Sequence, residues 1–360
     1  MLAPAERLRQ LAWRLAASTA LGRRCARERS VRVSVMGSVQ LVAALTLTIV
    51  CPMWLLLLGP LVLGVPHVAA DFRFLVARPL RPGTSRRPFL VMAALPIVGL
   101  VVARIASLWG LGPWTDVEIG FGLAGMLGAV AVSSGSVALR TSVGAAVIVV
   151  GAVALDSPGL AALVLAHLHH VVALGVWLAV TRDEPHFRRY VALATAVVAV
   201  GALILAGAFD SWIFAAGGLD TDAFGVTLGA MADTLAPTAE PVWAVRIVLV
   251  YAFGQAVHYT LWLRLMPTAE RFAPRAVAPS LRRAWRAWTS DLGRSGMALT
   301  AALTVAVPLL ALSDPGGVRT QYLTLVGFHG WLELMAVAYL AANYAPCAST
   351  TPVLHTRRGG

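Results

Sequence analysis

Long apolar segments alternate with short polar segments along most of the chain, from about residue 34 to residue 346. Most of the apolar segments approach the ~20 residues that a helix needs to cross the hydrocarbon of a bilayer. We therefore predict an all-α fold, a polytopic integral membrane bundle of about ten transmembrane helices. The predicted spans are 34–51, 53–76, 88–109, 117–139, 141–156, 158–181, 190–209, 241–266, 295–313 and 321–345.

Basic and acidic residues separate onto alternate connecting segments. Arginine is concentrated in the tail before residue 34, in segments 77–87, 182–189 and 267–294, and at the C-terminus. The opposite loops are acidic, and the longest of them, 210–240, holds five carboxylates. Because arginine-rich loops stay on the cytoplasmic side, this alternation predicts that the N-terminus and the C-terminus both lie in the cytoplasm.

Composition agrees with a membrane protein, since 58% of the residues are hydrophobic and 13% are charged. In a soluble protein the net charge of +12 would suggest a nucleic-acid partner, but here topology explains the arginines and no such partner is expected. We predict a basic N-terminal segment (1–33), a transmembrane domain (34–346) and a C-terminal tail (347–360). The expected location is the bacterial inner (cytoplasmic) membrane, with the lipid bilayer as partner; protein partners are not indicated.

Six of the eight histidines fall inside the predicted spans: His67, His167, His169, His170, His258 and His329. Imidazole inside hydrocarbon is costly and usually serves a function. These histidines lie on four separate spans, 53–76, 158–181, 241–266 and 321–345, which all run in the same direction across the membrane. The pattern predicts a shared intramembrane site, a metal or haem centre.

Two of these histidines are each followed, four positions later, by a carboxylate. Asp71 follows His67, and Glu333 follows His329, so each pair shares one face of its helix. A carboxylate at this spacing can accept the second N–H of a metal-bound imidazole. We therefore predict that Asp71 and Glu333 support the ligands rather than bind the metal. A break of the helix at Gly64 and Pro66 is expected just before the first pair.

The segment AHLHHVVALGVW (residues 166–177) holds three histidines within four residues. His167 and His170 are three positions apart and share a helix face, whereas His169 points about 100° away from His170. At most two of the three can serve one centre from this helix, so we predict His167 and His170 as ligands and His169 as a supporting residue.

The last histidine of the set, His258, belongs to a polar and aromatic stripe that includes Gln255 and Tyr259. We predict that these two side chains support it. The complete set of predicted metal ligands is His67, His167, His170, His258 and His329, with Asp71, Glu333, His169, Gln255 and Tyr259 as their supporting residues.

Nitrogen ligation without thiolates suits iron, copper or zinc, or a haem with axial histidines. The three cysteines fall in different segments, and the motifs of ATP-binding loops and of HExxH zinc proteases are missing. A non-haem Fe(II) centre within lipid would suit an oxygenase that acts on an apolar small molecule. Two alternatives stay open: a haem b protein for electron transfer or gas handling, and a proton-coupled transporter.

The sequence GVPHVAAD (residues 64–71) resembles the GxPHGxxD signature of the Brp/Blh family of bacterial and archaeal β-carotene 15,15′-dioxygenases. The resemblance implies a polytopic enzyme that holds Fe(II) through histidines of several helices and cleaves β-carotene with O₂ into retinal. It would match His67 and Asp71 to the signature, and the later histidines to three further patches. The chain differs from the family at Val68, where the signature has glycine, and at Glu333, which comes one position early.

Overall fold

The computed structural model describes residues 3–78, 87–112, 114–269 and 281–343. Within these ranges the chain is about 85% helical and forms no strand, which confirms the all-α prediction. The first helices are α1 (Ala3–Ser18), α2 (Ala20–Arg27), α3 (Arg29–Val50), α4 (Pro52–Leu58), η1 (Gly59–Leu63), α5 (Gly64–Asp71), η2 (Phe72–Ala77), α6 (Arg87–Leu108) and α7 (Thr115–Ala131). Then follow α8 (Val137–Asp156), α9 (Pro158–Thr181), α10 (Phe187–Leu205), α11 (Asp210–Ala216), α12 (Leu228–Leu235), α13 (Pro241–Thr260), η3 (Leu261–Leu265), α14 (Met266–Ala269), α15 (Leu281–Leu310), α16 (Pro315–Val326) and α17 (Phe328–Ala342).

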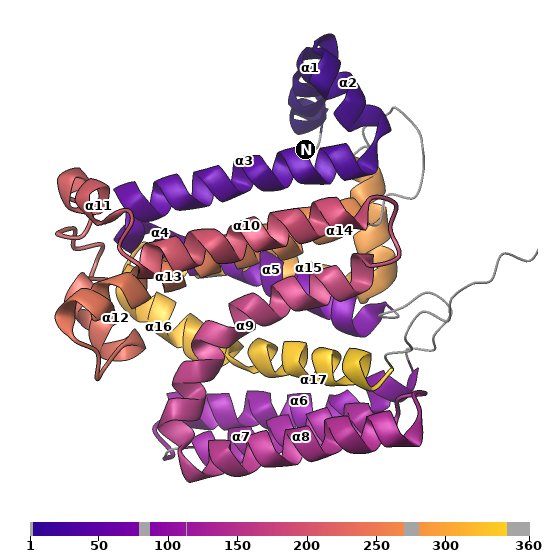
Figure 1. Ribbon diagram of the computed structural model, residues 1–360, viewed down its shortest axis with the longest axis vertical. Coiled ribbons are helices and arrows are strands. Elements are labelled where there is room, and N and C mark those ends of the chain that lie inside the picture. The colour runs from indigo at the N-terminus through magenta and orange to yellow at the C-terminus, as the bar shows by residue number, and fades with distance from the viewer. Residues whose placement is uncertain (1–2, 79–86, 113, 270–280, 344–360) are drawn as a thin grey trace, which may run out of the picture.

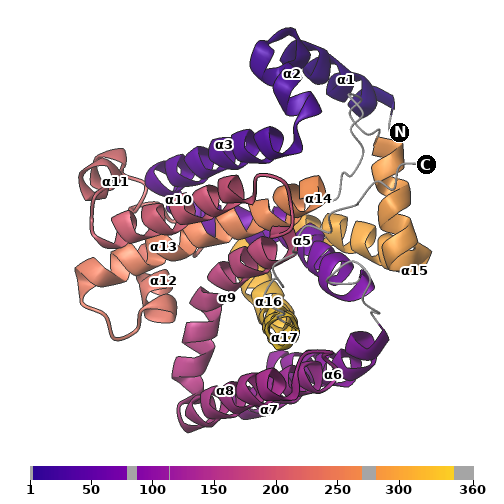
Figure 2. The ribbon, with the colours of Figure 1, turned by 45° about the vertical axis from the view of Figure 1, so that its right-hand side comes forward.

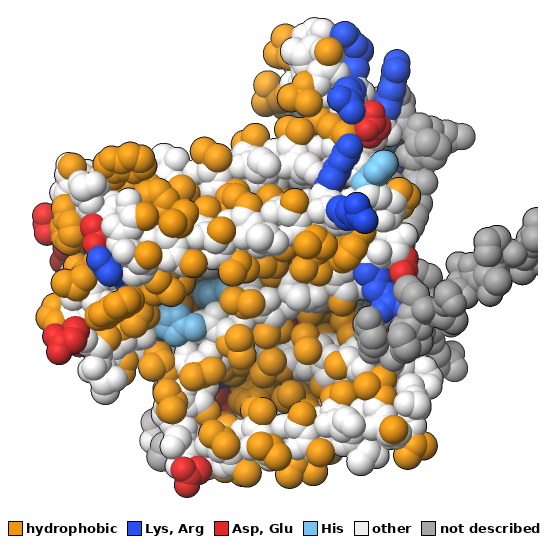
Figure 3. Space-filling view, viewed as in Figure 1, with side chains coloured by type: hydrophobic (Ala, Val, Ile, Leu, Met, Phe, Trp, Pro, Cys, Tyr) orange, Lys and Arg blue, Asp and Glu red, His pale blue; other side chains and the backbone are white. Residues whose placement is uncertain are grey.

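In the described part of the chain, nine helical stretches are long and apolar enough to cross a membrane. They correspond to nine of the ten predicted spans, and α7, with 17 residues, occupies most of the remaining one. Apolar side chains cover much of the outer surface, as Figure 3 shows, which is the surface expected of helices that face lipid tails. The chain is therefore a multi-pass membrane protein.

The boundary predicted at residue 139 is wrong, and the last span begins at Pro315 and not at residue 321. The span predicted at 117–139 ends as α7 at Ala131, and the next helix already begins at Val137. The sequence Ser133-Ser134-Gly135-Ser136 forms the turn, and the Ser136 side chain caps α8 by accepting a hydrogen bond from the backbone N–H of Leu139 at 3.3 Å. This turn comes earlier than hydropathy indicated because valine and alanine residues flank it on both sides.

Helices α6, α7 and α8 pack as one group, and α17 lies between this group and the rest of the bundle (Figures 1 and 2). α17 contacts α5, α6, α7, α8 and α9, and most of its residues are buried. On its other side, α3, α10 and α13 pack together and α9 joins them to α17. The most enclosed helix of the bundle is thus the one that carries His329 and Glu333.

Two of the histidine-bearing helices, α5 and α13, are irregular close to those residues. The described residues include three π-helical stretches: η1 and η2 on either side of α5, and η3 directly after α13. The predicted break near Gly64 therefore appears as a π-helical stretch that ends at Leu63. Stretches of π-helix are rare and often occur at functional sites.

The two ends of the bundle differ in the charge of their side chains. Acidic side chains lie at the end formed by α11, α12 and their loops, and arginines gather at the opposite end beside α1 and α2 (Figure 3). At the arginine-rich end, α15 changes direction at Gly293, which has a φ of +76°. This kink separates the basic start of α15 from its membrane-spanning part. The cytoplasmic position of both termini stays a prediction, and the C-terminal tail lies outside the described residues.

Candidate metal centre

His67 is fully enclosed between the π-helical stretches that flank α5. The ring is 2% exposed, and its Nδ1 lies 3.0 Å from the carbonyl oxygen of Gly64. A carbonyl oxygen can only accept, so Nδ1 carries the proton and Nε2 keeps its lone pair. This lone pair points to the interior of the bundle, where Nε2 lies 3.0 Å from His258 Nε2 and 3.4 Å from Asp71 Oδ2.

His329 is oriented in the same way at the start of α17. Its Nδ1 donates to the carbonyl oxygen of Val326 at 2.6 Å, and its Nε2 is buried without a hydrogen-bond partner in the described residues. The ring centroid lies 4.9 Å from that of His67. The break between α16 and α17 at Gly327 leaves the Val326 carbonyl free to accept this bond. The backbone thus fixes the tautomer of both rings.

His258 completes the group from α13. Its ring is 1% exposed, its Nδ1 has no described partner, and its Nε2 lies 3.5 Å from Glu333 Oε1 as well as 3.0 Å from His67 Nε2. Glu333 also accepts a hydrogen bond from Trp262 Nε1 at 2.9 Å, which holds its carboxyl group in place. Because His67 Nε2 has no proton, either His258 donates to it or both nitrogens bind one cation.

One potential ligand atom from each of His67, Asp71, His258 and His329 lies within 4.8 Å of the other three. All four residues are buried, and both carboxyl oxygens of Asp71 lack a hydrogen-bond partner among the described residues. Buried polar atoms are normally hydrogen-bonded, so unpaired atoms that converge on one point fit a bound cation. Three nitrogens and one carboxylate oxygen suit iron or zinc.

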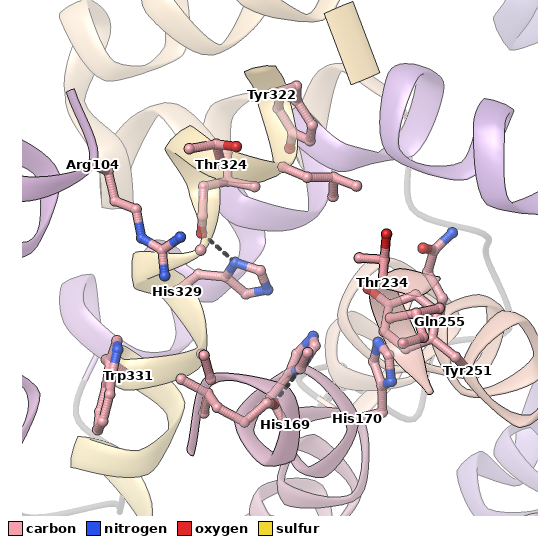
Figure 4. Close-up of a pocket in the computed structure, with 18 of the residues that line it drawn as sticks. Arg104, His169, His170, Thr234, Tyr251, Gln255, Tyr322, Thr324, His329 and Trp331 are labelled. Atoms are coloured by element: carbon pink, nitrogen blue, oxygen red, sulfur yellow. Dashed lines mark hydrogen bonds between the residues drawn. The ribbon is translucent and has the colours of Figure 1, made fainter. Parts of the chain in front are cut away.

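The HLHH segment on α9 is oriented differently from the prediction. His169 and His170 face the group, with ring centroids 5.0 Å and 5.3 Å from that of His258. His169 also donates from Nδ1 to the carbonyl oxygen of Leu165 at 3.0 Å, which directs its Nε2 away from its own helix. Both rings border the cavity beside the group (Figure 4).

His167, predicted as a ligand, is not brought to this group. Its Nε2 lies 3.1 Å from the carbonyl oxygen of Leu235 at the end of α12, and its ring packs edge-on against Tyr251. Neither His169 nor His170, which was also predicted as a ligand, is among the four converging residues, although their rings lie beside that of His258. The physical reason is the rotation of α9, which turns the face between His169 and His170 toward α13 and α17.

Asp71 also differs from its predicted role. We expected it to accept the second N–H of His67, but Gly64 accepts that N–H, and Asp71 lies on the Nε2 side of the ring. Asp71 is therefore placed as a potential ligand. Glu333 keeps a supporting position, although it approaches His258 and not His329, the histidine on its own helix.

Gln255 and Tyr259 line the same cavity as the histidines, and their support of His258 stays a prediction. The ring centroid of Tyr259 is 4.9 Å from that of His67. Gln255 donates from Nε2 to the carbonyl oxygen of Leu55 at 3.4 Å, and its Oε1 has no described partner. Neither side chain is in the set of four converging residues, so both line the site without belonging to it.

A cavity of about 400 Å³ opens next to the histidines. It extends to the starts of α7 and α16 and to α12, which are elements of the acidic end of the bundle. Figure 4 shows His169 and His329 projecting into it from α9 and α17, with His170, Tyr251 and Gln255 along one side. A small molecule could therefore reach the histidines from the acidic half of the bundle.

Sequence reasoning missed several residues of this cavity. Arg104 forms an ion pair with Glu118 at 2.6 Å and borders the cavity. Arg319 of α16 and Tyr322 were not expected to contribute, yet both are buried and line the cavity. An arginine that precedes an intramembrane histidine by ten positions was the available signal for Arg319.

Comparisons of the chain with protein-family models, with curated proteins and with solved structures find no match.

Proposed function

We propose that this protein is a membrane-embedded non-haem iron oxygenase that acts on an apolar or amphiphilic small molecule. The observation that carries the proposal is the convergence of His67, Asp71, His258 and His329, whose ligand atoms lie within 4.8 Å of one another in the interior of the bundle. Histidine nitrogens with one carboxylate, arranged so that further positions stay open, are typical of non-haem Fe(II) oxygenases.

The ligand atoms of these four residues are better satisfied by a bound cation than by hydrogen bonds among themselves. His67 and His329 each commit their Nδ1 proton to a backbone carbonyl, which is the usual arrangement for a metal-bound imidazole. Asp71 contributes a carboxylate without a hydrogen-bond partner among the described residues. Together they would hold the ion, and bound Fe(II) would supply the chemistry that activates O₂.

The surrounding residues would orient the ligands and receive the substrate. Trp262 holds the Glu333 carboxyl group, which in turn approaches His258. His169 and His170 border the cavity and present nitrogens to whatever occupies it. Apolar helices surround the group, which suits a reaction on a lipid-soluble compound.

The resemblance of residues 64–71 to the Brp/Blh signature makes β-carotene the first substrate to test. The same residues, His67 and Asp71, belong to the converging group, so the motif and the geometry point to one site. Cleavage would be measured as retinal formed from β-carotene by purified, iron-loaded protein under O₂.

Haem b receives less support from this geometry. Axial histidines must leave room for a flat macrocycle between them, but the rings of His67, His258 and His329 are packed at centroid distances of 4.9–5.9 Å. A visible spectrum of the purified protein separates the two cofactors, because only haem gives a Soret band.

The test of the proposal is metal content in matched variants. Purified protein loaded with Fe(II) should retain about one iron per chain, and His67→Ala and His258→Ala should lose it. His167→Ala is the matched control, since it removes the same kind of side chain from the same membrane region but outside the group, and it should retain the iron. Equal iron in all variants, or transport activity that needs no metal, would refute the proposal.

A further inference from the structure

A buried cation lies beside the cavity toward the acidic end of the bundle, outside the converging group. Arg319 is 7% exposed, lines the cavity, and forms no ion pair with any described carboxylate. Its Nε donates to the carbonyl oxygen of Leu56 at 2.8 Å, and its Nη2 contacts Met231 Sδ at 3.6 Å. A guanidinium has five N–H groups, so three of them lack an acceptor in the described residues.

Two neutral polar groups beside the same cavity also lack partners. The hydroxyl of Tyr322 and the Oε1 atom of Gln255 are buried without a described hydrogen bond. The two residues are 8% and 3% exposed, and Figure 4 shows them on α16 and α13 at the edge of the cavity. Each buried group left unpaired costs about 1–3 kcal/mol. An occupant with an acceptor would satisfy the Tyr322 hydroxyl, whereas Gln255 Oε1 can only accept and would need a donor.

The charges around the cavity leave one positive charge without a counter-ion. The other charged side chains that line it, Arg104 and Glu118, form an ion pair with each other at 2.6 Å. Arg319 is therefore the only cation among the described lining residues without a carboxylate partner. An uncompensated cation in a dry site selects a ligand with a single negative charge.

We propose that this cavity binds a single-chain amphiphile through a terminal carboxylate, with Arg319 as the anchor and Tyr322 as a second donor. A pure hydrocarbon such as β-carotene would leave these donors unpaired, so the amphiphile is an alternative to the carotenoid as the ligand of this cavity. The volume of about 400 Å³ is in the usual range for small-molecule sites and favours one chain over a two-chain phospholipid.

The cavity connects this anchor to the histidines. Tyr251 lines the cavity with Arg319, and its ring centroid lies 5.0 Å from that of His170. Tyr259 lines it as well and lies 4.9 Å from His67. A chain held at its carboxylate by Arg319 would therefore extend toward the converging group. The reaction of such a chain rests on the proposed oxygenase function, but its binding does not.

The experiment measures binding of radiolabelled palmitate and of methyl palmitate to the purified full-length protein in a non-ionic detergent, both metal-free and iron-loaded. Metal-free protein should bind palmitate at least tenfold more tightly than the ester. Arg319→Met should reduce palmitate affinity by roughly tenfold to a hundredfold, as expected for the loss of a charge-assisted hydrogen bond, and should leave ester binding unchanged. Arg319→Lys should retain most of the preference for the acid.

Two further variants secure the interpretation. Tyr322→Phe should weaken palmitate binding about fivefold, since one neutral hydrogen bond is lost. Arg246→Met is the matched control, because Arg246 pairs with Asp210 at 2.6 Å and does not line the cavity. This variant should leave the affinity for palmitate unchanged. Equal affinity for acid and ester, no binding of either, or an acid preference that survives Arg319→Met would overturn the proposal. Because metal-free protein is measured, these outcomes are independent of whether the protein holds iron.

Discussion

Substitution of Glu333 by glutamine tests how the interior of the bundle supports the converging group. The Glu333 side chain is fully buried, accepts a hydrogen bond from Trp262 at 2.9 Å, and places Oε1 3.5 Å from His258 Nε2. Glutamine keeps the size and an oxygen for Trp262, but it removes the carboxylate beside His258. The predicted effect is therefore on metal affinity and not on the fold.

The expected loss of metal affinity follows from the position of Glu333 beside His258, a proposed metal ligand. Removal of a group that supports a metal-bound histidine typically weakens metal affinity by about 10- to 100-fold. At about 1.4 kcal/mol per factor of ten, the stabilisation that the metal gives to the folded protein should fall by roughly 1.4–2.8 kcal/mol.

The assay is thermal unfolding in detergent, with and without saturating Fe(II), for the parent protein and for Glu333→Gln. The difference between the metal-loaded and metal-free forms isolates the metal-dependent part of stability from any change in packing. Glu118→Gln is the control, since Glu118 pairs with Arg104 away from the converging group; it should lower the stability of both forms equally. The reasoning is refuted if Glu333→Gln keeps the full metal-dependent shift.

Three further predictions concern other parts of the chain. Gly327→Ala would place a Cβ atom 2.8 Å from Arg104 Cζ, so the flexible guanidinium must move and its ion pair with Glu118 is disturbed; we expect a loss of about 1 kcal/mol in a denaturation experiment. Trp262→Phe removes the donor to Glu333 from a fully buried position and should cost a similar ~1–3 kcal/mol, measured by thermal unfolding. At the arginine-rich end, hydrogen bonds from Arg9 and from the first backbone N–H of α15 lower the pKa of Glu6 from 4.5 to about 2. This contact should therefore be complete above pH 4.5 and lost as the pH falls through about 2, which pepsin cleavage of α1 would report.

Hydropathy was sufficient to predict most of the membrane-spanning stretches, because the bilayer sets the length of a span and leaves a strong signal in composition, but it did not predict the short helices α11 and α12. It was also insufficient at the turn between α7 and α8. There, small residues continue on both sides of Ser133–Ser136, so the average hydropathy hardly changes. The break is decided by local hydrogen bonds of the serine side chains, such as the Ser136 cap on α8.

The sequence predicted which helices carry the candidate site. It did not predict how each helix is rotated about its own axis, and so which of its residues face the site. Periodicity shows which residues share a face, yet it does not say which face the neighbouring helices enclose. His167 and His170 do lie on one side of α9, but the packing of α13 and α17 selects the side shared by His169 and His170. The position of Asp71 was missed for another reason, because the irregular helix before α5 allows the Gly64 carbonyl to accept the hydrogen bond from His67 Nδ1.

The most direct test of the central claim is X-ray absorption at the iron edge of the purified, Fe(II)-loaded protein. The account predicts about one iron per chain with nitrogen and oxygen neighbours near ~2.1 Å and the outer-shell scattering of imidazole, which should disappear in His258→Ala and persist in His167→Ala. Protein that takes up no metal, or whose spectrum is the same in His258→Ala, would contradict it.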